Sequence, residues 1–308
     1  MTVRLVAIVG PTASGKTRLG VEVAHRLGSE IVSADSRQVY RGLDIGTGKD
    51  LDEYAAVDPP VRVHMLDVAD PQEVYTLVRY LQDVRGVFAA AEGDPRFASG
   101  AVPLVMVGGS GLYVEAVLRG FQPAVVPPDP ELRRRLEGED HGVLVGELER
   151  LAPALAARTD TSSRRRVIRA HEVLAAFDGR EPPALSPVAP PPATVFGIDV
   201  DRDVLRDRIA RRLQERLRDG MVDEVRGLLE RGVEPDRLRA LGLEYREITD
   251  HLVGGVAYAD MVERLRVRIM RFAKRQWTWF RGMERRGVPI RWITPDDVDA
   301  VVDAARPT

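Results

Sequence analysis

Residues 10–17, which read Gly-Pro-Thr-Ala-Ser-Gly-Lys-Thr, constrain the fold of this chain more than any other segment. They follow an apolar run at residues 3–9 and precede a helical pattern at residues 16–27. A strand, a Gly-x-x-x-x-Gly-Lys-Thr turn and a helix in this order predict a P-loop. In such a loop, backbone N–H groups and the helix N-terminus hold phosphate oxygens. An ordinary glycine turn is the alternative, and the context on both sides disfavours it.

In a P-loop, residues along the whole loop are expected to contact a diphosphate or triphosphate group. We expect Lys16 to place its ammonium on the terminal phosphate and the Thr17 hydroxyl to ligate Mg²⁺. The motif alone is typical of ATP-binding kinases and NTPases, so it does not specify the reaction. An NTPase also needs a strand that ends in a metal-binding Asp. Asp67 is the candidate, although a lone Asp at a strand end is commonly structural. The expected phosphate-binding residues are Gly10, Pro11, Thr12, Ala13, Ser14, Gly15, Lys16 and Thr17.

The pattern along the rest of the chain predicts a P-loop α/β fold with a doubly wound parallel sheet. Strand-like apolar runs alternate with helical periodicity, which indicates a parallel sheet with helices on both faces. After the first strand, the expected strands lie at residues 30–34, 61–68, 102–107 and 194–200. The expected long helices lie at residues 75–91, 204–231 and 258–281.

Two proline-rich breaks, at residues 123–130 and 182–192, enclose a segment whose pattern is helical only. We therefore expect a helical insertion domain at residues 124–192. The α/β core would comprise residues 1–123 and 193–308, and its C-terminal part would form a helical arm.

The composition excludes several classes of protein. The chain has no cysteine, which excludes disulfides, thiolate catalysis and cysteine-based zinc sites and favours a reducing cytoplasm. Its apolar runs are strand-sized and fall far short of the roughly 20 residues of a membrane helix. No signal peptide is visible at its start. With 44% hydrophobic and 30% charged residues, we expect a soluble, cytoplasmic protein that does not contact a membrane.

Positive charge is distributed unevenly along a chain whose net charge is −2. Residues 264–286 hold nine basic residues and one acidic residue, with Trp277, Trp279 and Phe280 among them. The net charge argues against non-specific binding of nucleic acid, whereas this local concentration favours it.

Lysine is nearly absent from the chain. Of 45 basic residues only Lys16, Lys49 and Lys274 are lysines, and the others are arginines. A retained lysine marks a position that requires a compact ammonium, or reflects chance. The P-loop motif shows that Lys16 is such a position. For Lys49 and Lys274 both interpretations stay open.

Asp35 follows the second expected strand, within the segment 33–40. Ligands of doubly wound sheets bind outside the carboxyl ends of the strands, so we expect Asp35 to face the P-loop. A carboxylate there can act as a general base or as a metal ligand. A helix N-cap is an equally good interpretation of the same residue.

A series of ordered motifs runs through nearly the whole chain. The P-loop, Ser-Ala-Asp-Ser-Arg-Gln-Val-Tyr at 33–40 and Leu-Asp-Ile-Gly-Thr-Gly-Lys at 43–49 resemble the tRNA dimethylallyltransferases, also called tRNA isopentenyltransferases. The order of the motifs makes this resemblance far more specific than a P-loop alone. Further matches follow at residues 107–113, 166–173, 220–225 and 272–281.

The resemblance implies an activity and a set of catalytic residues. Members of the family transfer a dimethylallyl group from its diphosphate to N6 of the adenosine 3′ of the tRNA anticodon, position 37. The P-loop would then hold the pyrophosphate of an isoprenoid, together with Mg²⁺. Asp35 would accept the N6 proton. Ser110, where the family usually has threonine, would donate to a phosphate oxygen, and Arg212 would neutralise the leaving pyrophosphate. Arg208, one turn earlier, is expected to face solvent.

The resemblance also implies a tRNA partner, bound through its anticodon stem-loop by what we expect to be a monomer. The flipped adenosine would be received by residues 35–38, and the arginines of 164–169 and 264–286 would contact the RNA backbone. Trp277 and Phe280 are expected in the core. The expected tRNA-binding residues are Asp35, Ser36, Arg37, Gln38, Arg165, Arg166, Arg169, Lys274 and Arg275.

Three departures from the family pattern place the chain in a divergent branch. Gly48-Lys49-Asp50 replaces Ala-Lys-Pro, Ser162-Ser163 stands where many relatives have Asn-Asp, and residues 241–247 carry extra residues inside a Gly-Tyr-Lys-Glu motif. The alternatives are transfer of the same group to free AMP, a small-molecule kinase, or an RNA-binding protein with a decayed site. The intact Lys16 and Asp35 speak against the last of these.

Overall fold

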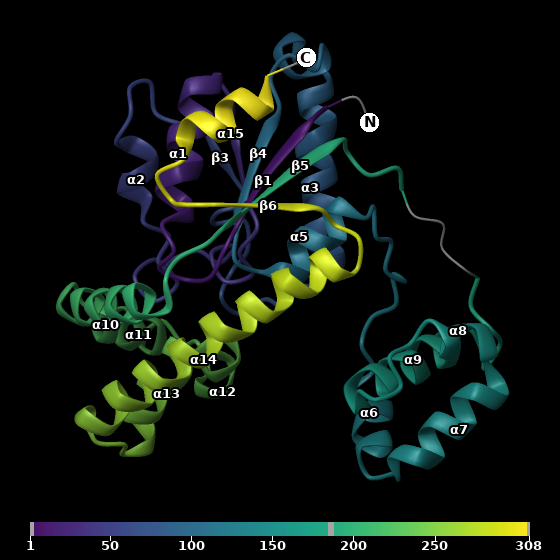
Figure 1. The fold of residues 1–308 in the computed structure, drawn as a ribbon. Coiled ribbons are helices and arrows are strands. Elements are labelled where there is room, and N and C mark those ends of the chain that lie inside the picture. The colour runs from purple at the N-terminus through teal and green to yellow at the C-terminus, as the bar shows by residue number, and fades with distance from the viewer. Residues whose placement is uncertain (1–2, 184–187, 307–308) are drawn as a thin grey trace. The chain divides into compact units, whose positions relative to one another are not determined.

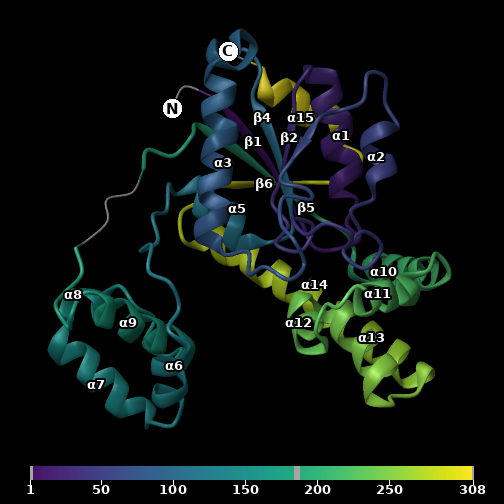
Figure 2. The ribbon, with the colours of Figure 1, turned by 180° about the vertical axis from the view of Figure 1, so that it is seen from behind.

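The computed structural model describes residues 3–183 and 188–306 (Figures 1 and 2). Contacts divide the chain into two compact units, Met1–Gly120 with Ala189–Thr308, and Phe121–Val188. Part of the expected proline-rich break, residues 184–187, lies outside the described residues. The role of residues 124–192 as an insertion domain stays a prediction.

A six-stranded parallel sheet forms the centre of the first unit within the described residues, with strand order β3-β2-β4-β1-β5-β6. Leu5 of β1 pairs with Leu104 of β4 on one side and with Ala193 of β5 on the other. The predicted P-loop α/β fold with a parallel sheet is therefore confirmed. The strands are β1 (Leu5–Val9), β2 (Ile31–Ser33), β3 (Val63–His64), β4 (Leu104–Gly108), β5 (Ala193–Ile198) and β6 (Ile290–Ile293).

Helices cover both faces of this sheet, so its central strands must be apolar on both sides. Every residue of β1 and β4 is buried. Helices α1, α2 and α15 lie on one face, and α3 and α5 lie on the other (Figures 1 and 2). Their bounds are α1 (Lys16–Leu27), α2 (Leu51–Ala55), α3 (Leu77–Glu92), α4 (Pro95–Ala98), α5 (Gly111–Leu118) and α15 (Val298–Ala305).

The remaining helices of the first unit follow β5 in the chain. The longest, α14, has 28 residues and carries the basic and aromatic segment of the sequence. It packs against α5, α10 and α13. The bounds are α10 (Arg202–Arg218), α11 (Met221–Glu230), α12 (Pro235–Leu241), α13 (Leu243–Gly254) and α14 (Tyr258–Arg285).

Three expectations about secondary structure are corrected. The single helix expected at 204–231 is two helices, because Gly220 between α10 and α11 takes a left-handed φ of 98°. The strand expected at 61–68 has only two residues, since Met65 and Asp67 also take left-handed φ values. The edge strand β6 was not predicted, because its four residues include an arginine and a tryptophan and lack a strand-like apolar run.

In its described residues, the second unit contains four helices around a core of its own. Leu144, Leu148 and Val167 are almost completely buried in that core. The buried carboxylate of Glu172 pairs with Arg133 at 2.8 Å and with Arg169 at 3.2 Å. The helices are α6 (Pro130–Glu137), α7 (His141–Leu151), α8 (Pro153–Ala157) and α9 (Arg164–Ala176).

Gly108 ends β4 where this strand comes closest to the segment after β2. A Cβ at Gly108 would lie 2.2 Å from the Ala34 carbonyl oxygen, a backbone atom that cannot move aside. We predict that Gly108→Ala lowers the free energy of unfolding by about 1–3 kcal/mol in urea titrations. Gly86→Ala is the control. Gly86 lies inside α3 with nothing from the described residues within 4 Å, so alanine should stabilise the protein by about 0.5–1 kcal/mol. Equal effects of the two substitutions would contradict the packing argument.

Candidate active site

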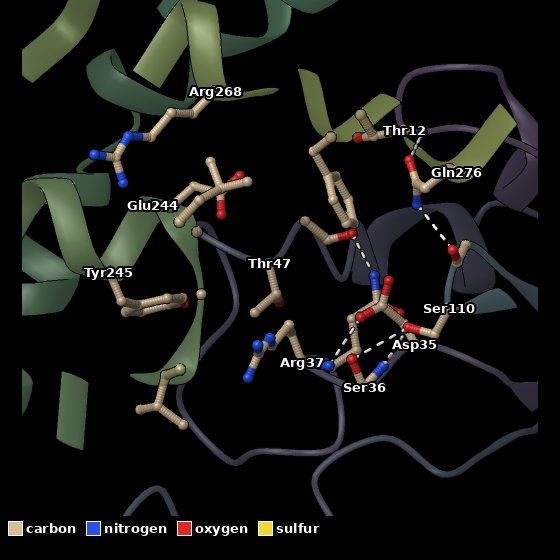
Figure 3. A pocket seen from close by; sticks show the side chains of 18 of the residues that line it. Thr12, Asp35, Ser36, Arg37, Thr47, Ser110, Glu244, Tyr245, Arg268 and Gln276 are labelled. Atoms are coloured by element: carbon tan, nitrogen blue, oxygen red, sulfur yellow. Dashed lines mark hydrogen bonds between the residues drawn. The ribbon is translucent and has the colours of Figure 1, made fainter. Parts of the chain in front are cut away.

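A cavity of about 760 Å³ lies within the first unit (Figure 3). Its floor comes from the segments that follow β1, β2 and β4, which are the P-loop, residues 35–38 and residues 109–113. Residues of α10, α12, α13 and α14 complete its walls. The parallel strands therefore bring their carboxyl ends to one ligand-sized space, as expected for a doubly wound sheet.

The P-loop is open to an anion. Gly15, the N-cap of α1, has a left-handed φ of 89° and gives the helix no side-chain cap. The Ser14 hydroxyl is buried and has no hydrogen-bond partner in the part of the chain that the structure describes. The Lys16 ammonium lies 3.4 Å from the Pro11 carbonyl oxygen. These uncapped N–H groups, the unpartnered hydroxyl and the ammonium fit the oxygens of a phosphate group.

The electrostatic surroundings of Lys16 change its acidity. Burial, with a further contribution from the nearby Arg212 guanidinium, lowers the pKa of Lys16 from 10.5 to about 8. Asp35 and Asp50 act in the opposite direction and do not offset this effect. The ammonium is therefore poised to gain from an anionic ligand.

Asp35 lies on one side of the cavity beside Ser36 and Ser110 (Figure 3). One Asp35 carboxylate oxygen accepts a hydrogen bond from the Arg37 backbone N–H at 2.9 Å, as in an Asx turn. The Ser110 hydroxyl accepts from the Ser36 N–H at 2.9 Å and donates to the Ser36 hydroxyl at 3.2 Å. Asp35 thus stabilises a turn rather than capping a helix, and its carboxylate still lines the cavity.

Gln276 of α14 joins two of the loops that form the floor of the cavity. Its buried side chain accepts from the Thr12 N–H at 2.8 Å and donates to the Gly109 carbonyl oxygen at 3.0 Å (Figure 3). The sequence placed Gln276 in a motif without giving it a role. Its place in that motif, inside the basic segment, is the signal that could have drawn attention to it.

Nine cationic and two anionic side chains line the cavity, in a chain whose net charge is −2. Such a concentration of positive charge attracts an anionic ligand. The two carboxylates are those of Asp35 and Glu244. The cations are Lys16, Arg37, Arg212, Arg216, Arg239, Arg246, Arg268, Arg271 and Arg275.

Three arginines of α10, spaced four residues apart, face the P-loop side of the site. Arg212 pairs with Asp50 at 3.0 Å, and Arg216 lines the same cavity. Arg208 lies within 3.5 Å of the Ser14 carbonyl oxygen, so the expectation that it faces solvent is wrong. The cause is the i, i+4 spacing, which puts all three side chains on one face of the helix.

Buried polar contacts hold the loop that leads from β2 to α2. The fully buried Lys49 ammonium donates to the Tyr40 carbonyl oxygen at 2.8 Å, to Asp44 at 2.6 Å and to Asp67. Asp67 is thus the partner of a structural lysine and does not line the cavity. The Lys49 site is a closed space in which one compact ammonium donates to three oxygens, which favours the special interpretation of this lysine over chance.

Glu224 of α11 fixes the same loop from the other side. Its carboxylate accepts backbone N–H groups of Asp44, Ile45 and Gly46 at 2.7–3.0 Å, and also the Tyr245 hydroxyl at 2.6 Å. A carboxylate with several N–H donors is a strong anchor. The Thr47 and Gly48 wall of the cavity therefore follows a rigid segment.

The residues expected to bind tRNA occupy different surroundings. Arg37 and Arg275 line the cavity, whereas the exposed Lys274 does not. Gln38 also lines it, and its amide donates to the Gly48 carbonyl oxygen at 2.7 Å. Ser36 lines it as well.

In the second unit, the three arginines expected to contact RNA differ in how far other residues of the unit already engage their side chains. Arg165 is exposed, and Arg166 pairs with Asp160 at 2.6 Å. Arg169 donates to the carbonyl oxygens of Val126 and Pro127 and pairs with Glu172. Arg169 therefore serves the internal structure of this unit.

The aromatic residues of α14 divide between core and site. Phe280 is fully buried, which confirms its expected core position. Trp277 is only half-buried and stacks on Trp292 at 4.9 Å beneath Arg281, so its expected place in the core is wrong. Trp279 was not predicted as a site residue. It lines the cavity, and its buried indole N–H has no hydrogen-bond partner within residues 3–183 and 188–306.

Known proteins share this architecture. A family model described as IPP transferase matches residues 38–283, and one described as isopentenyl transferase matches residues 3–66. The chain belongs to the IPP transferase family. Relatives named tRNA dimethylallyltransferase 1 are 45% identical in Syntrophus aciditrophicus, covering 98% of this chain and 97% of the relative, and 44% identical in Porphyromonas gingivalis, covering 94% and 93%.

Solved structures of similar proteins agree with this membership. A full-length tRNA isopentenylpyrophosphate transferase from Bacillus halodurans has 32% identity and a TM-score of 0.68, covering 98% of this chain and 94% of its own. A eukaryotic dimethylallyltransferase described as acting on tRNA has a TM-score of 0.74 at 20% identity, covering 96% and 75%, and supports the fold. Among the helices described for this IPP transferase, none has the length and apolar character to cross a membrane.

The lowered pKa of Lys16 predicts how anion binding depends on pH. A bound diphosphate favours the charged ammonium and raises its pKa, so Lys16 contributes fully below about pH 8, and its contribution falls as the pH rises above 8 toward the higher pKa of the complex. Calorimetric titration with inorganic pyrophosphate at several pH values measures this change. Lys16→Met is the control, because it keeps only the titration of the ligand itself. A wild-type to variant affinity ratio that stays constant up to pH 9.5 would refute the prediction.

Proposed function

We propose that the chain transfers a dimethylallyl group from dimethylallyl diphosphate to N6 of the tRNA adenosine 3′ of the anticodon, position 37, and releases pyrophosphate. The observation that carries this proposal is that an uncapped P-loop, Asp35 and several arginines all line the same cavity. The curated relatives named tRNA dimethylallyltransferase support the same activity. We place the reaction in the cytoplasm.

The proposed mechanism is a displacement at the allylic carbon. The N6–carbon bond forms while the carbon–oxygen bond to the diphosphate breaks, and the N6 proton passes to the Asp35 carboxylate. Negative charge develops on the departing pyrophosphate, so Lys16, Arg212 and the N–H groups at the start of α1 stabilise the transition state. The Ser110 hydroxyl, which lines the cavity next to Asp35, donates to a phosphate oxygen.

Mg²⁺ fits the donors that surround the P-loop. Thr17 lines the cavity beside Lys16 and would supply one hydroxyl ligand. No group of three or more His, Cys, Asp or Glu residues in the described part of the chain is arranged to hold a metal. Such a sparse donor set suits Mg²⁺, which keeps several waters and binds phosphate oxygens. When bound, the ion would neutralise charge on the diphosphate.

The cavity also offers apolar surface next to its cations. Leu112, Phe272 and Trp279 line it together with the P-loop residues. Such surface suits a five-carbon prenyl chain attached to the diphosphate.

Binding of tRNA is assigned to the arginines and to the loop after β2. The flipped adenosine would lie against residues 35–38, and the α14 arginines would hold the backbone of the anticodon stem-loop. Arg275 lines the cavity, and its guanidinium lies over the Phe272 ring, so α14 joins the catalytic space to a basic surface. We propose that Arg165 and Arg166 of the insertion domain add backbone contacts, and that the enzyme acts as a monomer.

The acceptor identifies the activity directly. We predict that the protein, incubated with dimethylallyl diphosphate and Mg²⁺, modifies unmodified tRNA that carries adenosine at position 37. Nucleoside mass spectrometry of the digested tRNA reads the product. Parallel reactions with AMP, and with ATP plus small-molecule acceptors, should remain unmodified. Prenylated AMP with unmodified tRNA would refute the assignment.

Asp35→Asn tests the proposed base. The amide oxygen still accepts the Arg37 N–H, so the turn remains, but the residue no longer takes up a proton. We predict that kcat falls by about 10²–10⁴-fold while the affinity for pyrophosphate is unchanged. Asp52→Asn, on the exposed face of α2, is the matched control and should retain full turnover. Loss of pyrophosphate binding in Asp35→Asn would instead assign Asp35 to the metal.

A further inference from the structure

Arg216 is a cation of the cavity for which the proposed mechanism has no role. It lies on the same face of α10 as Arg208 and Arg212, one turn beyond the latter, and its side chain is 14% exposed. Its Nη2 is buried and has no hydrogen-bond partner anywhere in the described chain. The carboxylate of Asp50 lies 3.7 Å from it, beyond hydrogen-bond distance.

The backbone at Gly48 leaves space for this guanidinium. A Cβ at Gly48 would lie 1.4 Å from Nη2 of Arg216 and 2.3 Å from Nη2 of Arg212. Gly48 also has a left-handed φ of 62°, which glycine adopts without strain. Two arginines can therefore reach the cavity here only because residue 48 has no side chain.

Asp50 is shared by both arginines. It pairs with Arg212 at 3.0 Å and lies 3.7 Å from Arg216. Although it is the N-cap residue of α2, its side chain makes no capping hydrogen bond. Gly48 and Asp50 are also the positions at which this chain departs from Ala-Lys-Pro. Asp50 is thus divided between two guanidinium groups, and the other acid that acts on Arg216, Glu244, makes no hydrogen bond to it.

The surroundings of Arg216 point toward phosphate. It lies close enough to Lys16 to lower the pKa of that ammonium, and it lines the same cavity as Thr17. Burial and Arg212 lower the pKa of Arg216 itself to about 10. A buried guanidinium without a full set of partners costs free energy in the unliganded protein, and an anion with several acceptor oxygens removes that cost.

We propose that Arg216 is a second arginine ligand of the diphosphate, and that Asp50 holds Arg212 and Arg216 in position until the diphosphate replaces it. The proposal rests on the proposed function for the identity of the donor, but it requires only that the P-loop binds a diphosphate. The Asp50 carboxylate resembles a phosphate oxygen pair in charge and in its preference for guanidinium groups. It therefore keeps both side chains ordered in the absence of the ligand.

Arg216→Met tests whether Arg216 binds the diphosphate, because methionine is a long side chain that lacks the charge. Isothermal titration with inorganic pyrophosphate and Mg²⁺, without tRNA, should show binding weakened by about 10- to 100-fold, the range for a lost charge-assisted contact. Thermal unfolding without ligand should be unchanged or shifted upward. Arg211→Met, on the exposed side of the same helix, is the matched control and should bind pyrophosphate like the wild type. Unchanged pyrophosphate affinity in Arg216→Met, with weakened tRNA binding, would overturn the proposal and assign Arg216 to the RNA backbone.

Asp50→Asn distinguishes two roles for Arg216, as a ligand of the diphosphate or as a support of the loop that carries Asp50. If Arg216 binds the diphosphate, the asparagine releases both arginines, and pyrophosphate should bind as tightly or up to about fivefold more tightly. If Arg216 only supports the loop through Asp50, Asp50→Asn will weaken binding as Arg216→Met does, and the proposal is overturned. The two proposals can fail separately. If Arg216→Met weakens pyrophosphate binding, Asp50→Asn does not, and the wild-type protein prenylates no tRNA, this inference is supported and the proposed function is refuted.

Discussion

Backbone N–H groups at the start of α1 have no side-chain cap, and this helix end favours an anion. The chain places cations around the same point and gives them few carboxylates. Arg212 and Arg216 share the Asp50 carboxylate, Lys16 has only Asp35 and Asp50 as nearby acids, and the Ser14 hydroxyl has no hydrogen-bond partner among the described residues. The folded protein therefore concentrates unsatisfied positive charge where a diphosphate belongs, before any ligand arrives.

This charge can be concentrated only because polar contacts outside the cavity make its walls rigid. Gln276 joins the P-loop to the loop after β4, Glu224 binds three successive N–H groups, and Lys49 is buried among oxygens. A site that stabilises a leaving group must be ordered in advance, since reorganisation during the reaction would consume its advantage. The three residues come from α14, α11 and the loop before α2, so the site depends on the whole first unit.

Local signals in the sequence predicted the parts of the structure that depend on neighbours in the chain. The P-loop and the helix at 16–27 are such parts, and both are present as expected. Contacts between distant residues could not be predicted in this way. Arg216 is one of many arginines in a helix, and its place in the cavity depends on Gly48, far away in the chain. Lys49 and Asp67 likewise meet only because Asp67 lies just beyond β3 in the folded sheet.

The scarcity of lysine has a chemical consequence. The side-chain amines of Lys16, Lys49 and Lys274 occupy a ligand cavity, a closed interior and an exposed helix surface, respectively. A reagent that acylates neutral amines will find Lys49 inaccessible, because its side chain is fully buried. Lys16 lines the cavity and has its pKa lowered to about 8, so near that pH it offers a neutral, nucleophilic amine until a ligand covers it. The extent of acylation at that one residue therefore reports the occupancy of the P-loop without any engineered label.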